Sequence, residues 1–170
     1  MQRPTFLQSG NQGFTLVEAM VIVAIVATLI GFSYTGFSGV LQRQRCQAAL
    51  QKVALLLKQA QMQAVEKHIP CSVTLGTGNK TIQTFLDHDH DLILDVGDND
   101  TLLEQINIAQ EYRGVDVISG AQFYFSTRGI PKGTYPKIKL RCQNTSGPDG
   151  NVTVSSMGRV SIAMPDNWQR

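Results

Sequence analysis

The feature that constrains this chain most is an apolar run near its N-terminus. The 19 residues from Phe14 to Phe32 contain one charged side chain, the carboxylate of Glu18. At about 1.5 Å per helical residue, such a run matches the roughly 30 Å hydrocarbon core of a bilayer. Its aliphatic and phenylalanine side chains favour insertion by about 3–7 kcal/mol in total, whereas one carboxylate costs about 3 kcal/mol or less. We therefore expect this segment to insert into a membrane as a helix.

Two common targeting segments share this general appearance. A secretory signal peptide has an apolar stretch of only about 7–15 residues and ordinarily no carboxylate, although small residues suited to signal-peptidase cleavage occur between Ser33 and Gly39. In an ordinary signal anchor, Glu18 would be incidental and would have no functional role. The first alternative predicts a mature chain that starts near residues 33–39, and the second predicts an uncut Met1.

The residues at the head of the apolar run favour a third kind of segment. Residues 13–18 read GFTLVE, which resembles the leader motif of type IV pilins and type II secretion pseudopilins. The resemblance implies that a prepilin peptidase cuts between Gly13 and Phe14 and that the new N-terminal Phe14 is methylated. The leader departs from the family pattern at Asn11 and Gln12, where a basic residue often precedes the glycine.

The single carboxylate of the apolar run fits this resemblance. A carboxylate in an apolar environment needs a cationic partner. In a filament core, the mature α-amino group of a neighbouring subunit would serve Glu18 in this way and would set the axial register between subunits. The resemblance thus implies a single-pass protein of the bacterial inner membrane, with a periplasmic C-terminal domain, that assembles with other pilin or pseudopilin subunits.

The pattern after the apolar run is that of an amphipathic helix. Small and apolar residues recur at spacings of three and four, which places them on one stripe of a helix: Cys46, Leu50, Val53, Leu57, Ala60 and Ala64. Pro70 ends the helix. We expect this stripe to cover a β-sheet.

The rest of the chain alternates strand-like segments with Gly, Pro and Asn turns. The expected strands are 71–75, 81–86, 105–109, 115–118, 121–125, 138–142, 151–155 and 159–163. The sequence therefore predicts an α+β, pilin-like fold in which a long N-terminal helix packs on an antiparallel β-sheet domain. Its expected parts are a leader (1–13), a transmembrane or filament-core helix (14–41), the amphipathic half of the same helix (42–69) and an extracytoplasmic β-rich domain (70–170).

Two later segments narrow the resemblance. Residues 125–129 (FSTRG) and 154–160 (VSSMGRV) resemble the GspH/FimT branch, which comprises minor pilins and minor pseudopilins. That branch implies a structural, low-abundance subunit with no catalytic activity, and the sequence contains no GxSxG motif and no arrangement of Ser, Cys and His typical of a nucleophilic enzyme. The resemblance leaves open whether the filament is a type IV pilus or a type II secretion pseudopilus.

An aspartate-rich segment is a candidate calcium loop. Counted from the first aspartate, carboxylates fall at positions 1, 3, 5, 9 and 12 of an EF-hand-like loop: Asp87, Asp89, Asp91, Asp95 and Asp98. Leu92 occupies the sixth position, where the sharp turn of such a loop requires glycine, and the last carboxylate is Asp rather than the longer Glu. The competing interpretation is an acidic, solvated loop with no cofactor.

A set of basic residues is a candidate DNA contact. Some members of the GspH/FimT branch capture DNA for natural transformation through a C-terminal GRxR motif, but this chain has Ser161 in place of the second arginine. The near balance of 15 Lys and Arg against 13 Asp and Glu also counts against a nucleic-acid binder. The residues that would contact phosphates are Arg128, Lys137, Lys139, Arg141 and Arg159.

Three cysteines outside the cytoplasm predict one disulfide and one free thiol. Cys71 opens the first expected strand and Cys142 closes a later one, so we predict a bridge between Cys71 and Cys142. A bridge between Cys46 and Cys71 is the alternative.

Overall fold

The computed structural model of the chain describes residues 14–76, 81–95, 99–133, 136–143 and 149–164, and gives only the backbone of residues 32–38. The chain divides into two compact units, Met1–Ser38 and Gly39–Arg170. One helix, α1 (Leu16–Lys67, 52 residues), contributes to both units. The first unit holds its N-terminal part, and the second unit holds the remainder together with every described strand.

Helix α1 begins where the sequence places a capping residue. The backbone N–H of Glu18 donates to Oγ1 of Thr15 at 3.3 Å, and Ala19 N–H donates to the Thr15 carbonyl at 3.1 Å. Threonine followed three residues later by glutamate is a capping-box sequence, in which the hydroxyl satisfies a backbone donor of the first turn. The helix ends at Lys67, three residues before Pro70, as predicted from the proline.

The transmembrane prediction for residues 14–41 stays a prediction. No helix in the described part of the chain is long and apolar enough to cross a membrane.

Two antiparallel sheets form the β part of the second unit. The first sheet has the order β3-β2-β1-β5-β6 and the second the order β4-β7-β8-β9. The strands are β1 (Cys71–Leu75), β2 (Thr81–Leu86), β3 (Thr101–Asn107), β4 (Val115–Gly120), β5 (Phe123–Phe125), β6 (Pro131–Gly133), β7 (Lys137–Cys142), β8 (Gly150–Val154) and β9 (Val160–Ala163). The predicted α+β arrangement of a long N-terminal helix and an antiparallel β-sheet domain is confirmed, but the division of the strands between two sheets was not predicted.

Most expected strands lie where the sequence placed them, and two differences have local causes. The strand expected at 105–109 instead runs from Thr101 to Asn107, because the Asn107 side chain accepts a hydrogen bond from Gln110 N–H and caps a short helix, α2 (Ile108–Glu111). Strand β6 was missed because it is a three-residue edge strand that starts with Pro131.

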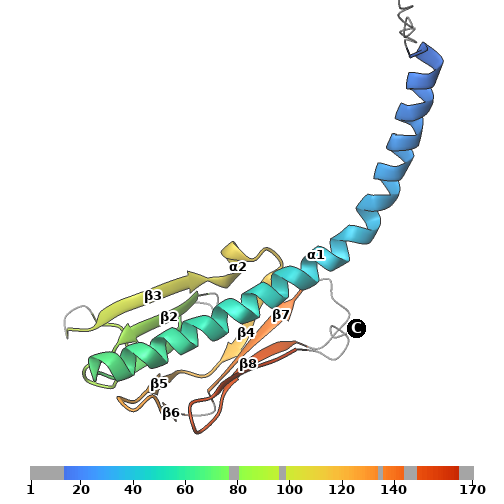
Figure 1. The fold of residues 1–170 in the computed structure, drawn as a ribbon. Helices are drawn as coiled ribbons and strands as arrows, with labels where there is room; N and C mark the ends of the chain where they lie inside the picture. The colour runs from blue at the N-terminus through green and yellow to red at the C-terminus, as the bar shows by residue number, and fades with distance from the viewer. Residues whose placement is uncertain (1–13, 77–80, 96–98, 134–135, 144–148, 165–170) are drawn as a thin grey trace, which may run out of the picture. The chain divides into compact units, whose positions relative to one another are not determined.

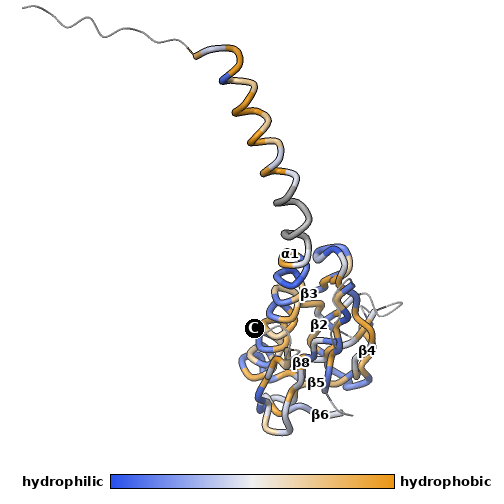
Figure 2. The backbone as a smooth tube through the Cα atoms, turned by 90° about the vertical axis from the view of Figure 1, so that its right-hand side faces the viewer, coloured by the Kyte–Doolittle hydropathy of each residue, from blue (hydrophilic) through white to orange (hydrophobic). Residues whose placement is uncertain are grey.

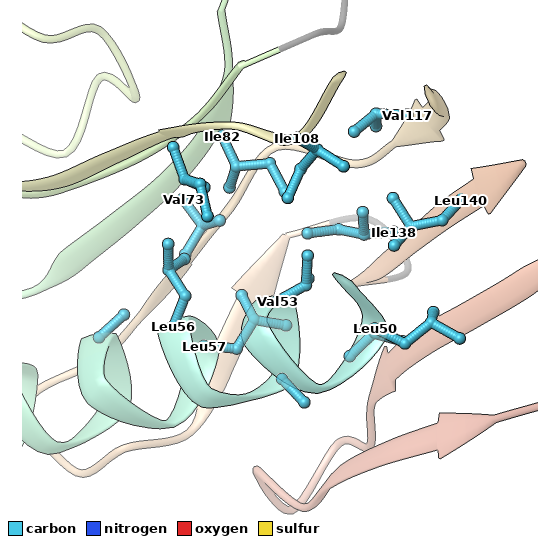
Figure 3. Packing of buried hydrophobic residues seen from close by; sticks show 14 of the residues in the cluster. Leu50, Val53, Leu56, Leu57, Val73, Ile82, Ile108, Val117, Ile138 and Leu140 are labelled. Atoms are coloured by element: carbon cyan, nitrogen blue, oxygen red, sulfur yellow. The ribbon is translucent and has the colours of Figure 1, made fainter. Parts of the chain in front are cut away.

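The core of the second unit lies between α1 and the two sheets. All six residues of the predicted helix stripe are buried, which confirms the prediction. Figure 3 shows Leu50, Val53, Leu56 and Leu57 of α1 directed at residues of both sheets, among them Val73 and Ile82 of the first and Ile138 and Leu140 of the second. Figure 1 shows the same arrangement, with this part of α1 laid along the strands. The helix therefore holds the two sheets together.

Candidate functional sites

The predicted processing site lies at the edge of the described chain. Gly13 falls outside the described residues, and Phe14 is exposed. Thr15 caps the helix and Glu18 lies in its first turn. Since the helix starts at Leu16, the Gly13–Phe14 bond precedes the first helical residue by two positions.

The first unit exposes its apolar side chains on all sides. Ten large apolar residues of its helix are exposed: Leu16, Val17, Met20, Val21, Ile22, Val23, Ile25, Val26, Leu29 and Ile30. Figure 2 shows the hydrophobic colouring that runs along this segment. Contiguous apolar surface of this extent marks a site of membrane or protein contact. Glu18 is the one charged residue among the described residues of this unit.

The aspartate loop between β2 and β3 is organised by its own carboxylates. Asp87 is fully buried and accepts hydrogen bonds from Ser72 Oγ at 2.5 Å, His90 N–H at 2.6 Å and Leu92 N–H at 3.2 Å. Asp89 accepts from Asp91 N–H at 3.3 Å. Such side chain to backbone bonds are typical of Asx turns. They fix the path of the loop.

These contacts shift the pKa values of the first two aspartates in opposite directions. Burial acts to raise the pKa of Asp87, but the hydrogen bonds from Ser72 and from the His90 and Leu92 backbone stabilise the anion and hold its pKa below the ordinary value. The Asp91 N–H acts to lower the pKa of Asp89, but partial desolvation and the nearby Asp87 and Asp91 carboxylates raise it above the ordinary value.

The predicted calcium ligands are only partly brought together. Carboxylate oxygens of Asp87 and Asp89 lie within 4.8 Å of each other and of Asp100, a residue that the sequence interpretation did not include. Asp91 and Asp95 are not in that group, and Asp98 lies outside the described residues. Leu92 has a φ of 65°, the left-handed conformation that the sixth loop position requires, although it is not glycine. Calcium binding stays a prediction.

The basic residues of β7 share one side of the second sheet. Ile138 and Leu140 are buried, whereas Lys137 and Arg141 are exposed and Lys139 is half-buried, as the alternation predicted. Arg141 lies 3.7 Å from Asp149, and its strand partner is Asp116. This side of the sheet therefore carries both signs of charge.

Arg128 and Arg159, the two other predicted DNA contacts, lie on a matched pair of hairpin turns, which we call the arginine turns (Ser126–Ile130 and Ser155–Arg159). In each turn the serine and the residue four positions later, Ile130 or Arg159, are joined by two hydrogen bonds. The serine N–H donates to the carbonyl of that residue, and the serine hydroxyl accepts from its N–H. The glycine N–H donates back to the serine carbonyl. Gly129 and Gly158 both have positive φ, 73° and 82°, which favours glycine there.

Gln61 of α1 joins the arginine turns, and sequence reasoning missed it. Its Nε2 donates to the carbonyl of Gly129 at 2.8 Å and to that of Gly158 at 3.1 Å. A Cβ on Gly158 would lie 2.6 Å from the Gly129 oxygen, so the two turns are in direct contact. One turn connects strands of the first sheet and the other connects strands of the second. No sequence signal marks a half-buried glutamine for this role.

The predicted disulfide is wrong. The structure joins Cys46 of α1 to Cys142 of β7, with a Cα–Cα distance of 6.0 Å, and leaves Cys71 as a buried free thiol. Cys71 follows the end of α1, whereas Cys46 lies about 30 Å earlier along the helix, at about 1.5 Å per residue. Cys142 lies beside Cys46, so both cysteines are too far from Cys71 for a disulfide. Burial and the nearby Asp87 carboxylate raise the pKa of Cys71 to about 12.

The chain is similar to known proteins in two separate ways. Residues 8–34 match the prokaryotic N-terminal methylation motif. The structure is similar to the type IV minor pilin FimU of Pseudomonas aeruginosa, with a TM-score of 0.54 and 14% identity over 72% of this chain and 90% of that one. It is also similar to the minor pseudopilin EpsH of the Vibrio cholerae type II secretion system, with a TM-score of 0.53 and 10% identity over 72% and 96%. No curated protein matches the chain in sequence.

These findings confirm the resemblance to the type IV pilins and type II secretion pseudopilins. The motif match covers residues 8–34, which include the end of the expected leader and the apolar run. The structural matches show that the fold is similar to that of a minor pilin and a minor pseudopilin.

Proposed function

We propose that this chain, with its methylation motif and minor-pilin fold, is a minor pilin or minor pseudopilin of the GspH/FimT type. It is a membrane-anchored structural subunit that polymerises into, or primes, a type IV pilus or a type II secretion pseudopilus, and it catalyses no reaction. The observation that carries the proposal is the presence of both features in one chain.

Processing comes first in this proposal. A prepilin peptidase removes residues 1–13 by cutting between Gly13 and Phe14, and Phe14 is then N-methylated. The exposed position of Phe14 and the helix start at Leu16 support an accessible bond at this point. The cut gives the mature chain an α-amino group on Phe14, four residues before Glu18.

Anchoring and assembly follow from the exposed apolar helix. Residues 14–41 lie in the inner membrane before assembly, as a single pass with the β-rich domain in the periplasm, and in the filament core afterwards. The ten exposed apolar side chains of the first unit support this, because they would be buried in either environment. Lipid and neighbouring helices are equally apolar, so assembly needs a polar contact to set its register.

Glu18 supplies that contact in the proposal. Its carboxylate pairs with the α-amino group of a neighbouring subunit, since charged groups in an apolar filament core persist only when paired. Within the described first unit no cationic side chain is available to Glu18, which supports a partner from another chain.

DNA capture is the alternative function, and less supports it. Arg141 lies beside Asp149, and Asp116 is its strand partner, so the β7 surface is not uniformly positive. The proposal of DNA contact at Lys137, Lys139, Arg128 and Arg159 depends on residues that a structural subunit could also display to protein partners.

The test compares cells with and without the prepilin peptidase. In wild-type cells we expect a fraction of the protein to sediment with sheared filaments or with a crosslinked pseudopilus fraction. That fraction should lack residues 1–13. Without the peptidase, the chain should retain residues 1–13, stay in the inner membrane and disappear from the filament fraction. Equal filament incorporation with and without the peptidase would contradict the proposal.

A further inference from the structure

One end of the second unit brings three segments of the chain together at the start of its part of α1. Gln42 Nε2 donates to the Gly114 carbonyl at 2.8 Å, and a Cβ on Gly114 would lie 2.5 Å from that nitrogen. The turn between α2 and β4 therefore packs directly on α1. The same carbonyl accepts from the backbone N–H of Gln143, which follows β7. The Cys46–Cys142 bridge joins β7 to α1 about one helical turn further along.

Three arginines surround this contact, and we call them the basic end (Arg43, Arg45 and Arg113). Arg113 belongs to the turn itself and is exposed. Arg43 is exposed and Arg45 is half-buried. At about 100° per helical residue, these two lie about 80° to either side of the line that joins Gln42 to Cys46 on the surface of α1. The turn that carries Arg113 packs at Gln42, between them.

The positive charges of the basic end are not neutralised within the described part of the chain, where no ion pair includes any of the three arginines. The acidic side chains of the adjoining segments each interact with another residue: Asp149 with Arg141, Asp116 with Gln143, and Glu111 with Tyr112. The three guanidinium groups are therefore available to an anion outside the chain.

The basic end directly follows the proposed membrane segment. That segment comprises residues 14–41, and Arg43 and Arg45 come two and four positions after its last residue. The two residues before Gln42 are exposed apolar side chains, Val40 at 49% and Leu41 at 38%. Apolar side chains followed at once by arginines are typical of the bilayer interface, where cationic groups reach the headgroups while their stems stay in apolar surroundings.

We propose that the basic end binds the headgroups of anionic phospholipids on the periplasmic face of the inner membrane and thereby orients the β-rich domain before assembly. Guanidinium groups suit this partner because their N–H donors pair with phosphate oxygens. Each arginine near an anionic surface favours contact about fivefold, and three together favour it about 100-fold. Since Arg113 lies off the helix, the three charges define a plane, and contact through all of them fixes the tilt of the domain. The inference rests on the proposed membrane anchoring.

The contact is tested on the full-length chain reconstituted in lipid nanodiscs that contain a trace of headgroup-labelled fluorescent lipid. A donor dye is placed on Gln110→Cys, an exposed position of α2 three residues before Arg113. The native thiols take up little dye, because Cys46 and Cys142 are paired and burial raises the pKa of Cys71 to about 12. We expect more energy transfer to the labelled headgroups in discs that contain phosphatidylglycerol than in discs of phosphatidylcholine alone.

Matched double substitutions make the test specific. Arg43→Gln with Arg113→Gln should lower the occupancy of the contact about 25-fold in phosphatidylglycerol discs, so that transfer falls to its phosphatidylcholine value. Arg128→Gln with Arg159→Gln removes the same charge from the arginine turns and should leave transfer unchanged. Those turns contact Gln61, about 28 Å further along α1 than the basic end.

Salt provides a second readout of the same contact. Raising the ionic strength from about 0.1 M to about 1 M shortens the Debye length from about 10 Å to about 3 Å, and should lower transfer as the first pair of substitutions does. Equal transfer in the two kinds of disc, or an equal loss with both pairs of substitutions, would overturn the proposal. Equal transfer together with reduced filament incorporation of Arg43→Gln with Arg113→Gln would assign these arginines to a protein contact instead and would also overturn it.

Flotation with phosphatidylcholine vesicles separates this inference from the proposed function. A chain that floats with the vesicles but shows no lipid-dependent transfer is anchored without the headgroup contact, which overturns the inference and leaves the proposed function standing. A chain that does not float with the vesicles is not anchored in the membrane, which contradicts the proposed function and overturns this inference with it.

Discussion

The two units of this chain share the long helix α1, but its apolar side chains are exposed in the first unit and largely buried in the second. From residue 39 onward, α1 buries one stripe, with Leu50, Val53 and Leu57 fully buried against two sheets. From Leu16 to Ile30, large apolar residues on every side of the helix are exposed. The second unit satisfies its hydrophobic surface within the chain, whereas the first unit can do so only with lipid or another molecule.

This difference separates stability from assembly. The second unit is stabilised by its core, by the Cys46–Cys142 bridge and by polar contacts from Gln42 and Gln61 of α1 to turns of the sheets. Glu18 has a capping contact for its backbone but no described partner for its carboxylate. Substitutions in the second unit should therefore change the free energy of unfolding, and substitutions in the first unit should change assembly instead.

Glu18→Gln should have the largest effect, and only on assembly. The neutral side chain makes membrane insertion easier but leaves the α-amino group of a neighbour unpaired, at a cost of about 3–5 kcal/mol for an uncompensated buried charge. The measurement is the share of chain in the filament fraction by quantitative immunoblot, which should fall more than about tenfold. Thr28→Val is the control, because the Thr28 hydroxyl is satisfied by Ile25 of its own helix at 2.7 Å. Normal incorporation of Glu18→Gln would contradict the pairing.

Loss of the disulfide should destabilise the second unit by about 2–5 kcal/mol, because the bridge closes a long loop, with a sequence separation of 96. Cys46→Ala tests this by guanidinium unfolding of the full chain in detergent, followed by circular dichroism. Cys71→Ala is the matched control and should cost much less, since it leaves the bridge intact. Equal losses for the two variants would argue against the Cys46–Cys142 pairing.

Two neighbouring leucines of α1 compare buried and exposed positions directly. Leu57→Ala should cost about 2–5 kcal/mol because it leaves a cavity between helix and sheets. Leu55→Ala, at an exposed position of the same helix, should change unfolding by no more than about 0.5 kcal/mol. If Leu55→Ala instead reduces filament incorporation, the exposed side of α1 in the second unit also contacts a neighbouring subunit.

Asp87 should make the stability of the second unit depend on pH. Its folded pKa lies below the unfolded value of about 3.9, so its contribution is fully present above that value and is lost as pH falls through the folded pKa. Asp87→Asn should cost about 1–3 kcal/mol at neutral pH, and its difference from wild type should shrink as the pH falls below about 4. Asp95→Asn, which alters an exposed carboxylate, is the control. A difference that is independent of pH would show that the anion is not what stabilises the loop.

Gln61→Ala should have the smallest effect, a loss of about 1–2 kcal/mol from two hydrogen bonds to Gly129 and Gly158. Gln42→Ala removes one comparable bond, to Gly114 at 2.8 Å, and should cost about half as much. Amide hydrogen exchange should show faster opening at both arginine turns in Gln61→Ala alone. Unchanged protection of the turns would mean that they are held without the glutamine.

The sequence predicted features that follow from local periodicity. The spacing of Cys46, Leu50 and Val53 predicted the buried stripe, and Pro70 predicted the end of α1. The strands of the first hairpin, 71–75 and 81–86, were predicted to the residue. Each of these depends on neighbours within a few positions of the chain.

Features that depend on distant contacts could not be predicted in this way. The disulfide prediction failed because Cys46 and Cys142, 96 residues apart in sequence, meet only after the second sheet packs on α1. Gln61 contacts Gly129 and Gly158 for the same reason. Asp100 joins the aspartate loop although it lies outside the twelve-residue pattern that starts at Asp87. The processing residues Gly13, Phe14 and Glu18 were predicted from motif resemblance, and their roles stay predictions.

The intact mass and N-terminal residue of the protein extracted from its native membrane or filament test the central claim most directly. The account predicts a mature chain that starts at Phe14 and is heavier by one methyl group than the unmodified sequence. A chain that starts near residues 33–39, or an uncut chain that starts at Met1, would contradict it. In either case the exposed apolar helix would be a signal peptide or a plain anchor, not part of a filament core.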